Sequence, residues 1–386
     1  MKKMFCALWI LALLSAPLAA EEFGLRFQEA KTPDHPAFSL LFSDCSLQRG
    51  CPEALKPREG AQRNSWFYRV KIAGRSFYAA ADPSVRRMYF DIDGDADLSD
   101  EKAVQGEPSA CRGLLGIERA LLFGPVALES GARVMAMLTE SKRLEVFPAG
   151  FMTGDITLEG RTFPVALVDA NFDGRYDGVF SGGETHDVLI VDFNGDGAIS
   201  EWRAMDGETA PLGRFLHLGD RYYSVKPAGD GSSISLEAAQ LETGTLETGL
   251  EGAFMALWSD CGFHYLGGTE GKWELPAGLY RPRLVGFKGV DGAGRWSITA
   301  ENTGRVGTFS VEAGGTQQVT FGAPLVIRLD PRRSGGSISS GIAVFGQAGE
   351  KYPIYAHLDG NPRFPPAIEV FVEDGTRIAR GRFEFG

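Results

Sequence analysis

The chain is unusually rich in glycine, and this limits the folds that it can form. Fifty of its 386 residues are glycine, and they follow no period of three. That share is roughly twice the average of about 7%. Each glycine weakens a helix interior by about 1 kcal/mol, whereas tight turns between strands use glycine readily. Because 44% of the residues are hydrophobic and 11% are aromatic, we expect packed cores built from short strands.

Alternating segments between the glycines support this expectation. RWSITAE places Trp296, Ile298 and Ala300 on one face, and GTFSVEA does the same with Phe309 and Val311. A period of two between turns is typical of antiparallel sheets. The sequence therefore predicts a mainly β fold of antiparallel hairpins and sandwiches with strand-entered acidic loops. Helix is expected only as short pieces at 99–104 and 200–205.

The order of these patterns predicts several regions along the chain. Two hairpins, at 71–82 and 157–169, share a Gly-Arg turn followed by an aromatic residue, and each leads towards an acidic loop. We interpret them as a degenerate repeat. The expected regions are a signal peptide (1–20), an N-terminal β region with the first acidic loop (21–125), a β region with the second and third acidic loops (126–250), and a C-terminal β-sandwich region (251–386) with a linker or long turn near 331–337.

The N-terminus has the pattern of a secretory signal peptide. Lys2 and Lys3 precede an apolar run at 5–14, and Ala19 and Ala20 provide small residues for cleavage. The protein is therefore expected to be exported (periplasmic, cell-surface or secreted), with no membrane span after cleavage. With 39 basic and 50 acidic residues, nucleic acid is not expected as a partner.

Cysteine usage fits an oxidising compartment. Cleavage removes Cys6 and leaves an even number of cysteines, which favours disulfide bonds in an exported protein. Three pairings are possible. We favour Cys45 with Cys51, which closes a short loop, and by default Cys111 with Cys261.

Three acidic segments place oxygen-bearing side chains at alternate positions, and apolar strands lead into them. Calcium prefers six to eight oxygen ligands, and a loop with alternating acids can curl around the ion. The candidate ligands of the first loop are Asp91, Asp93, Asp95, Asp97 and Ser99. Those of the second loop are Asp169, Asn171, Asp173, Arg175 (through its carbonyl) and Asp177. Those of the third loop are Asp192, Asn194, Asp196, Ala198 (through its carbonyl) and Ser200.

Each segment resembles the calcium loop of EF-hand proteins, including strand-entered loops in exported bacterial proteins. The resemblance covers about 36 residues and implies bound calcium rather than an activity. Glycine stands at position 6 of the third and second loops, and Ala96 in the first; all three lack the glutamate of position 12. We rank the loops third, second, first. Missing ligands would come from Glu101, Glu201, Glu184 or Asp187, and the alternative is a solvated Asp-Gly turn in each case.

Motifs of catalysis are absent from the sequence. It contains no HExxH, GxSxG, P-loop or dinucleotide fingerprint. The weaker candidates are a Glu184–His186–Asp187 cluster, a Cys261–His264 pair, and a sugar-stacking platform of Trp258, Trp273 and Trp296. We therefore expect an exported calcium-binding protein whose ions are structural and which acts as a binding or structural module for an unidentified protein or glycan ligand. The alternative is an exported hydrolase or carbohydrate-active enzyme.

Overall fold

The chain folds almost entirely into antiparallel sheets. The computed structural model describes residues 20–29, 44–48, 50–58, 65–72, 75–113, 116–182, 186–193, 195, 208–218, 221–291, 294–334, 337–353, 357–358, 361–362, 367–371 and 377–382. These ranges contain strands and no helix, so the predicted mainly β fold is confirmed. The helix expected at 99–104 is wrong, because residues 99–103 are irregular and Val104 begins a strand. The one expected at 200–205 lies outside the described residues.

Two sheets face each other in the N-terminal unit. One sheet has the order β3(Asp44–Gln48), β4(Trp66–Ile72), β5(Arg75–Asp82), β6(Arg87–Phe90) and β7(Val104–Gln105). The other has the order β11(Leu144–Pro148), β10(Arg133–Thr139), β9(Gly116–Ala127) and β8(Glu107–Gly113). β11 lies beside β3 and β7 beside β9, so the two sheets close into a barrel. The long strand β9 runs through the boundary expected at residue 125.

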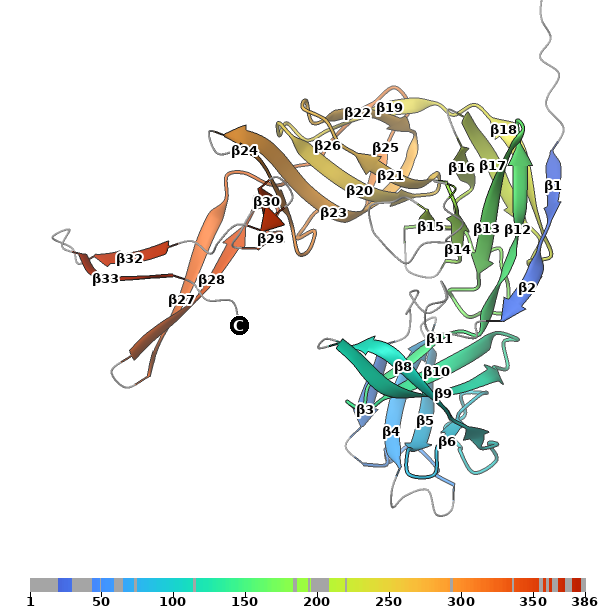
Figure 1. Cartoon of the computed structure of the whole chain (residues 1–386). Coiled ribbons are helices and arrows are strands. Elements are labelled where there is room, and N and C mark those ends of the chain that lie inside the picture. Colours follow the sequence, from blue (N-terminus) through green and yellow to red (C-terminus); the bar gives the residue numbers. More distant parts are fainter. Residues whose placement is uncertain are drawn as a thin grey trace, which may run out of the picture.

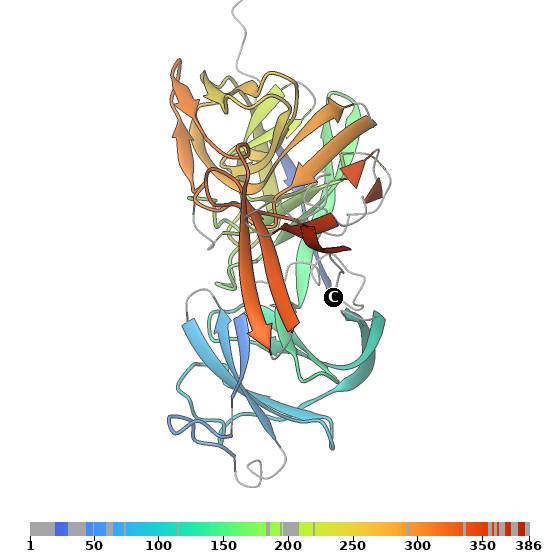
Figure 2. The same cartoon turned by 90° about the vertical axis from the view of Figure 1, so that its left-hand side faces the viewer.

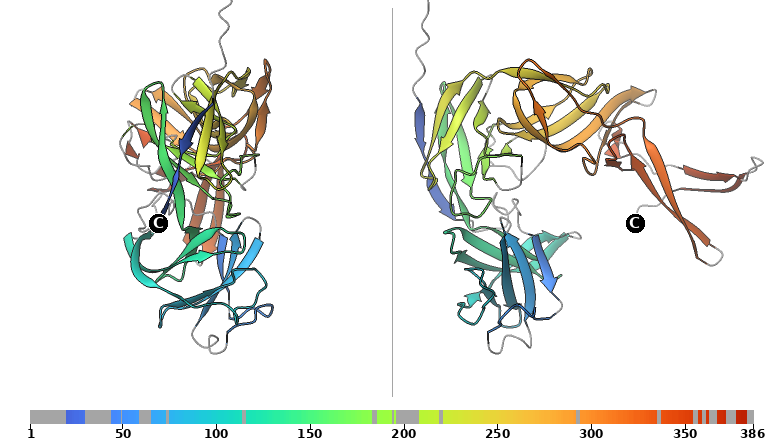
Figure 3. Two further views of the ribbon diagram at one scale, coloured as in Figure 1. Left: turned by 90° about the vertical axis from the view of Figure 1, so that its right-hand side faces the viewer. Right: turned by 180° about the vertical axis from the view of Figure 1, so that it is seen from behind.

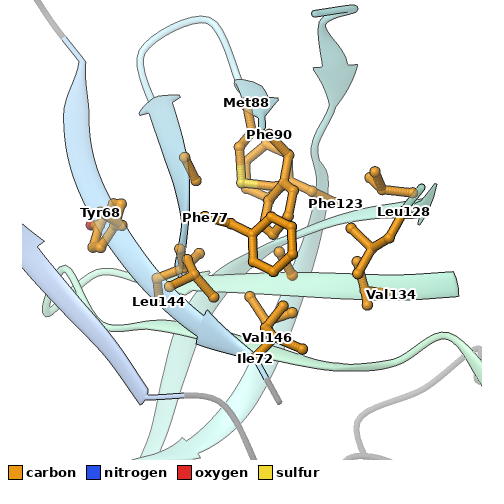
Figure 4. Close-up of a cluster of buried hydrophobic side chains, with 14 of the residues drawn as sticks. Tyr68, Ile72, Phe77, Met88, Phe90, Phe123, Leu128, Val134, Leu144 and Val146 are labelled. Atoms are coloured by element: carbon orange, nitrogen blue, oxygen red, sulfur yellow. The ribbon is translucent and has the colours of Figure 1, made fainter. Parts of the chain in front are cut away.

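The core of this barrel is aromatic and aliphatic (Figure 4). Alternation along the strands sends one set of side chains inward, which include Tyr68, Phe77, Phe90, Phe123 and Val146. All five are at most 3% exposed. Burying a large apolar side chain contributes on the order of 2 kcal/mol, so this core holds the strand that precedes the first acidic loop.

The middle unit consists of a second pair of sheets. One has the order β15(Thr209–Pro211), β14(Val188–Val191), β13(Arg161–Val168), β12(Gly150–Leu158) and β2(Arg26–Glu29). The other has the order β1(Glu21–Gly24), β18(Ser233–Ala239), β17(Arg221–Pro227) and β16(Phe215–Leu218). The first strands of the chain thus join both sheets, because β1 pairs with β18 and β2 pairs with β12. β14 is buried on both faces, which matches its unbroken apolar sequence.

The C-terminal unit begins at residue 243. Its smaller sheet has the order β22(Lys272–Pro276), β19(Thr243–Glu247) and β26(Thr316–Gln318), the last two being parallel. Its larger sheet has the order β21(Gly262–Leu266), β20(Ala253–Ser259), β23(Gly278–Asp291), β24(Gly294–Thr299), β30(His357–Leu358) and β31(Asn361–Pro362), with β25(Phe309–Val311) paired to β23. The remaining strands are β27(Val326–Ser334), β28(Ser337–Phe345), β29(Lys351–Tyr352), β32(Ala367–Phe371) and β33(Arg377–Arg382). Of the stretch 331–337, residues 331–334 form the end of β27 and residue 337 begins β28, while 335–336 lie outside the described residues.

The three units form an arch (Figure 1). The N-terminal barrel lies at one end, the middle unit joins it to the C-terminal unit, and the β27–β28 hairpin extends from the far end. The views from the side and from behind show the same arrangement (Figures 2 and 3). β11 and β12 are separated by one residue, so the barrel and the middle unit follow each other directly. The first acidic loop therefore extends from the N-terminal barrel, and the second from the middle unit.

The predicted disulfide bonds are wrong for the described part of the chain, which contains none. Cys45 packs against the barrel core from β3. The thiol of Cys51 points instead towards backbone carbonyl oxygens, 3.7 Å from that of Pro52. Cys261 is a buried thiol in the turn after β20, which also removes the default pairing with Cys111. An even number of cysteines does not determine their pairing, which depends on which way each strand directs its side chains.

Candidate metal centre

The first aspartate of every acidic loop is buried at the end of a strand. Asp91 follows β6, Asp169 follows β13 and Asp192 follows β14. Their exposed fractions are 0%, 6% and 2%. A carboxylate that is taken out of water costs free energy unless hydrogen bonds or a cation compensate it. The shared placement means that all three loops begin with a desolvated carboxyl group held by a rigid sheet.

The first loop gathers three carboxyl groups around one point. Oxygen atoms of Asp91, Asp93 and Asp95 all lie within 4.8 Å of one another. Backbone amides orient them: the amide of Gly94 donates to Asp91 at 2.8 Å, and the amide of Asp95 donates to Asp93 at 3.2 Å. Burial and the charge of Asp93 raise the pKa of Asp91. Three converging carboxyl groups can hold a metal ion, whose charge would relieve their repulsion.

Asp97 and Ser99 are engaged differently from the other predicted ligands of this loop. The ammonium of Lys56 contacts Asp97 at 2.5 Å, and the hydroxyl of Ser99 donates to the same carboxylate at 2.5 Å. These bonds lower the pKa of Asp97 to about 2. Glu101 accepts a hydrogen bond from the amide of Ile92 at 2.8 Å and is 7% exposed. The fourth carboxyl group of the loop therefore has a cation of its own.

The backbone of the first loop carries the strain that its sequence predicts. Ala96 stands where an EF-hand loop has glycine, and its φ is +63°. An alanine in this left-handed region costs on the order of 1 kcal/mol. Its amide lies beside the carboxyl of Asp91, so the strained residue contributes to the curl of the loop around its first aspartate.

The second loop brings together two acids that are distant in sequence. Val168 of β13 pairs with Val188 of β14, so the next pair beyond the ladder is Asp169 and Asp187. The carboxylate of Asp187 accepts hydrogen bonds from the amides of Gly178 at 2.7 Å and Ala170 at 3.2 Å. That of Asp169 accepts from Gly174 at 3.0 Å. Like charges at facing positions of two strands destabilise a sheet.

Burial gives these two acids strongly perturbed titration. Desolvation raises the pKa of Asp169 to about 7, and the nearby charge of Asp173 adds to the effect. Desolvation also raises the pKa of Asp187 to about 8, with the charges of Asp169 and Asp173 adding to it. Within the described ranges, neither group forms an ion pair with a basic side chain. Such a pair favours a bound cation or a proton.

Two more predicted ligands of the second loop, Asn171 and Asp177, have different surroundings. The amide group of Asn171 is close to Asp187, because a Cβ added to Gly178 would lie 2.6 Å from its nitrogen and 3.0 Å from the Asp187 carboxylate. The carbonyl oxygen of Asn171 accepts from the amide of Asp173 at 3.0 Å. Asp177, in contrast, is paired with the guanidinium of Arg175, whose Nε donates to it at 2.9 Å. The Asn171 amide nitrogen thus lies near the Asp187 carboxylate, whereas Asp177 is engaged by Arg175.

The third loop lies largely outside the described residues. Of its predicted ligands, Asn194, Asp196, Ala198 and Ser200 belong to that part. Asp192 is described: its carboxylate accepts from the amide of Gly195 at 2.6 Å. This hydrogen bond repeats the one between Gly94 and Asp91, so the two loops begin alike. The ranking of the third loop above the others stays a prediction.

Sequence reasoning found these loops by spacing but gave Asp187 only as one of several distant acids. The signal for it is the register of an antiparallel pair: Asp169 ends one apolar run, and Asp187 precedes the next. If those runs pair directly, the two acids must face each other. Glu184, named with it, lies outside the described residues. His186 is 2% exposed and packs edge-on against Phe180, with ring centroids 5.3 Å apart.

The other chemical candidates occupy structural positions. Cys261 is 1% exposed, and burial with the charge of Asp260 raises its thiol pKa to about 12. His264 contacts the hydroxyl of Ser259 at 3.0 Å rather than the thiol of Cys261. Trp258 is buried beneath the guanidinium of Arg283, and Trp296 packs edge-on against Phe287. A Cys–His nucleophile and an exposed tryptophan platform are therefore unsupported.

Comparisons with known proteins yield no assignment. No family model, curated protein or solved structure matches the chain. Among the described residues, no helix has the length and apolar character needed to cross a membrane. Functional inference therefore rests on the loops themselves.

Proposed function

We propose that this is an exported calcium-binding protein whose ions stabilise its sheets and which serves as a binding or structural module. The observation that carries the proposal is the convergence of Asp91, Asp93 and Asp95 at the end of β6. The buried Asp169–Asp187 pair supports a second ion. Export rests on the signal-like N-terminus, of which residues 1–19 lie outside the described part.

Calcium is the ion that this ligand chemistry favours. The groups around both loops are carboxylate, amide and carbonyl oxygens, without cysteine or histidine ligands among those described, and hard cations prefer such oxygens. Magnesium demands a small octahedral cage with several waters. Irregular loops with oxygens from successive residues suit the larger and more flexible calcium shell. No glutamate stands at position 12 of any loop, so we expect affinities near 10⁻⁴ to 10⁻³ M, as in extracellular modules.

A module is favoured over an enzyme by the distribution of perturbed acids. The described carboxyl groups Asp91, Glu101, Asp169 and Asp187 have a raised pKa. Every one of them belongs to the first or second loop or contacts it. A hydrolase would need acids with a raised pKa at an open site, whereas these four are at most 7% exposed.

Calorimetric melting tests the proposal. One millimolar calcium over a 10⁻⁴ M site adds about 1.4 kcal/mol per site, so the melting temperature should rise by a few degrees with calcium and fall with a chelator. Magnesium should do less. Asp93→Ala should abolish the part of the calcium-dependent rise in melting temperature that comes from the first loop. Asp155→Asn, a change of an exposed aspartate on β12, should leave that rise unchanged. Equal melting with calcium and chelator would remove the proposal.

A further inference from the structure

The mouth of the N-terminal barrel contains a groove that the calcium loops do not use. Its volume is about 600 Å³, within the usual range for small-molecule sites. Apolar side chains form its walls, among them Trp66, Pro108, Leu121 and Leu138. They come from β4, β8, β9 and β10, so both sheets of the barrel contribute (Figure 1).

Strand register shows that the groove opens into the barrel interior. Leu121 of β9 faces Pro108 of β8 on one side and Leu138 of β10 on the other. Side chains two residues apart share a face, so Leu121 lies on the face that carries Phe123 into the core. Leu138 belongs to that core, and Trp66 and Leu121 pack against it. The walls of the groove are thus continuous with the packed apolar core of the barrel.

The rim of the groove is positively charged, although the chain has a net charge of −11. Arg119 lies two residues before Leu121 and on the same face, and Arg86 comes from the turn between β5 and β6. Both side chains are exposed, and neither forms an ion pair with another described residue. Among the described lining residues Glu140 is the single acid, and the ammonium of Lys142 lies 5.0 Å from the centre of the Trp66 ring.

We propose that this groove binds a small amphipathic carboxylate, with its apolar tail in the barrel mouth and its carboxylate on Arg86 and Arg119. An aliphatic tail would cover the exposed parts of Leu121 and Trp66, gaining about 25 cal/mol for each Å² removed from water. Guanidinium groups bind carboxylates through paired hydrogen bonds. Two arginines against one glutamate favour an anionic head group over a neutral or cationic one. This binding goes beyond the proposed role of calcium and does not depend on it.

Titration calorimetry with ten-carbon ligands below their micellar concentrations tests the proposal on the full mature chain. Decanoate should bind, decanol should bind at least tenfold more weakly, and decyltrimethylammonium more weakly still. Arg86→Ala and Arg119→Ala should each weaken decanoate binding about tenfold to a hundredfold, as expected for a lost hydrogen bond to a charged group. Arg87→Ala changes a neighbouring exposed arginine outside the lining and should leave the affinity unchanged.

Charge reversal gives a second measurement that does not depend on loss of binding. The double variant Arg86→Glu/Arg119→Glu should prefer decyltrimethylammonium to decanoate, and its melting curve shows whether it is folded. The proposal is overturned if folded wild type binds no decanoate, binds decanol equally well, or loses as much affinity with Arg87→Ala. Binding of an acidic apolar peptide without binding of decanoate would overturn it as well.

Discussion

Replacing Asp187 by asparagine should stabilise the protein in chelator and weaken its response to calcium. The substitution keeps the shape of the side chain but removes its charge. With the pKa raised from 3.8 to about 8, ionising this buried group costs the folded state on the order of 5 kcal/mol at pH 8. Asparagine loses one of the two amide hydrogen bonds to a charged oxygen, about 1.5–3 kcal/mol. In chelator at pH 8 the variant should therefore be about 2–3 kcal/mol more stable than wild type.

The sign of this effect should change with pH and with calcium. Because the folded-state pKa of Asp187 is raised, the folded protein binds more protons than the unfolded chain between about pH 4 and pH 8. The stability of the chelated wild type therefore falls as pH rises through that window. At pH 5 the cost is only about 1.5 kcal/mol, so the variant should be no more stable than wild type. With millimolar calcium at pH 8, wild type binds the ion and is stabilised by it. The variant lacks one of the ion's ligands and should gain less stability from calcium.

Urea unfolding and calorimetry at pH 5 and pH 8, each with calcium and with chelator, measure these four conditions. Asp155→Asn, the same change at an exposed position of β12, is the matched control and should shift none of them by more than about 0.5 kcal/mol. The reasoning is refuted if Asp187→Asn destabilises the chelated protein at pH 8, or if its response to calcium equals that of wild type.

Three further measurements examine other parts of the structure. Asp192→Ala should remove more of the calcium-dependent rise in melting temperature than Asp91→Ala, and the reverse order would show that the ranking of the loops by their sequence is mistaken. In the native protein a thiol reagent should react with exposed Cys51 and not with Cys261, which is buried and has a pKa of about 12; rapid labelling of Cys261 would contradict the packing of the turn after β20. Gly174→Ala should lower the free energy of unfolding in urea by more than about 2 kcal/mol, because φ is +80° and a Cβ would collide with the Ser130 carbonyl. Gly160→Ala has a similar φ but lies in open space, so it should lower the free energy of unfolding by only about 1 kcal/mol. Equal losses of stability in the two variants would refute the predicted collision.

The strands were predictable because their signals are local. Alternation around Trp296 and Ile298, and the unbroken apolar run of 188–191, each appear as strands in the structure. Sheet membership was not predictable in the same way. Residues 21–24 and 26–29 follow the expected cleavage site and pair with strands more than a hundred residues away. Such pairings depend on which edges remain open once the rest of the unit has folded, and no short segment encodes that.

The candidate metal centre likewise combines features that the sequence predicts locally with contacts that depend on the fold. Spacing alone located Asp91, Asp93 and Asp95, because neighbours at alternate positions of a tight loop must lie close together. Spacing placed Asp97 with them, yet Lys56, 41 residues earlier, pairs with it. Spacing also placed Asp177 at the ligand position 9 of the second loop, but in the structure its carboxylate is paired with the guanidinium of Arg175. A basic residue takes an acid out of a ligand set when the fold brings the two together, and the sequence does not show when this happens.

The position of the Asp169–Asp187 pair explains why an ion here would be structural. The pair closes the β13–β14 ladder at the point where the chain leaves the sheet for the seventeen-residue segment between the two acids. Amides from that segment, those of Ala170, Gly174 and Gly178, already donate to the two carboxylates. A cation between the carboxylates would therefore bind both strand ends and the folded-back loop at once, and its removal would leave two facing charges to push them apart. Among the described residues, the first loop has no second acid facing it from the neighbouring strand: its three acids follow one another within five residues, and the β5 residue beside Asp91 is Tyr78, whose amide donates to the Asp91 carboxylate. Loss of calcium should thus loosen only the loop in the N-terminal barrel, but should open the sheet edge in the middle unit.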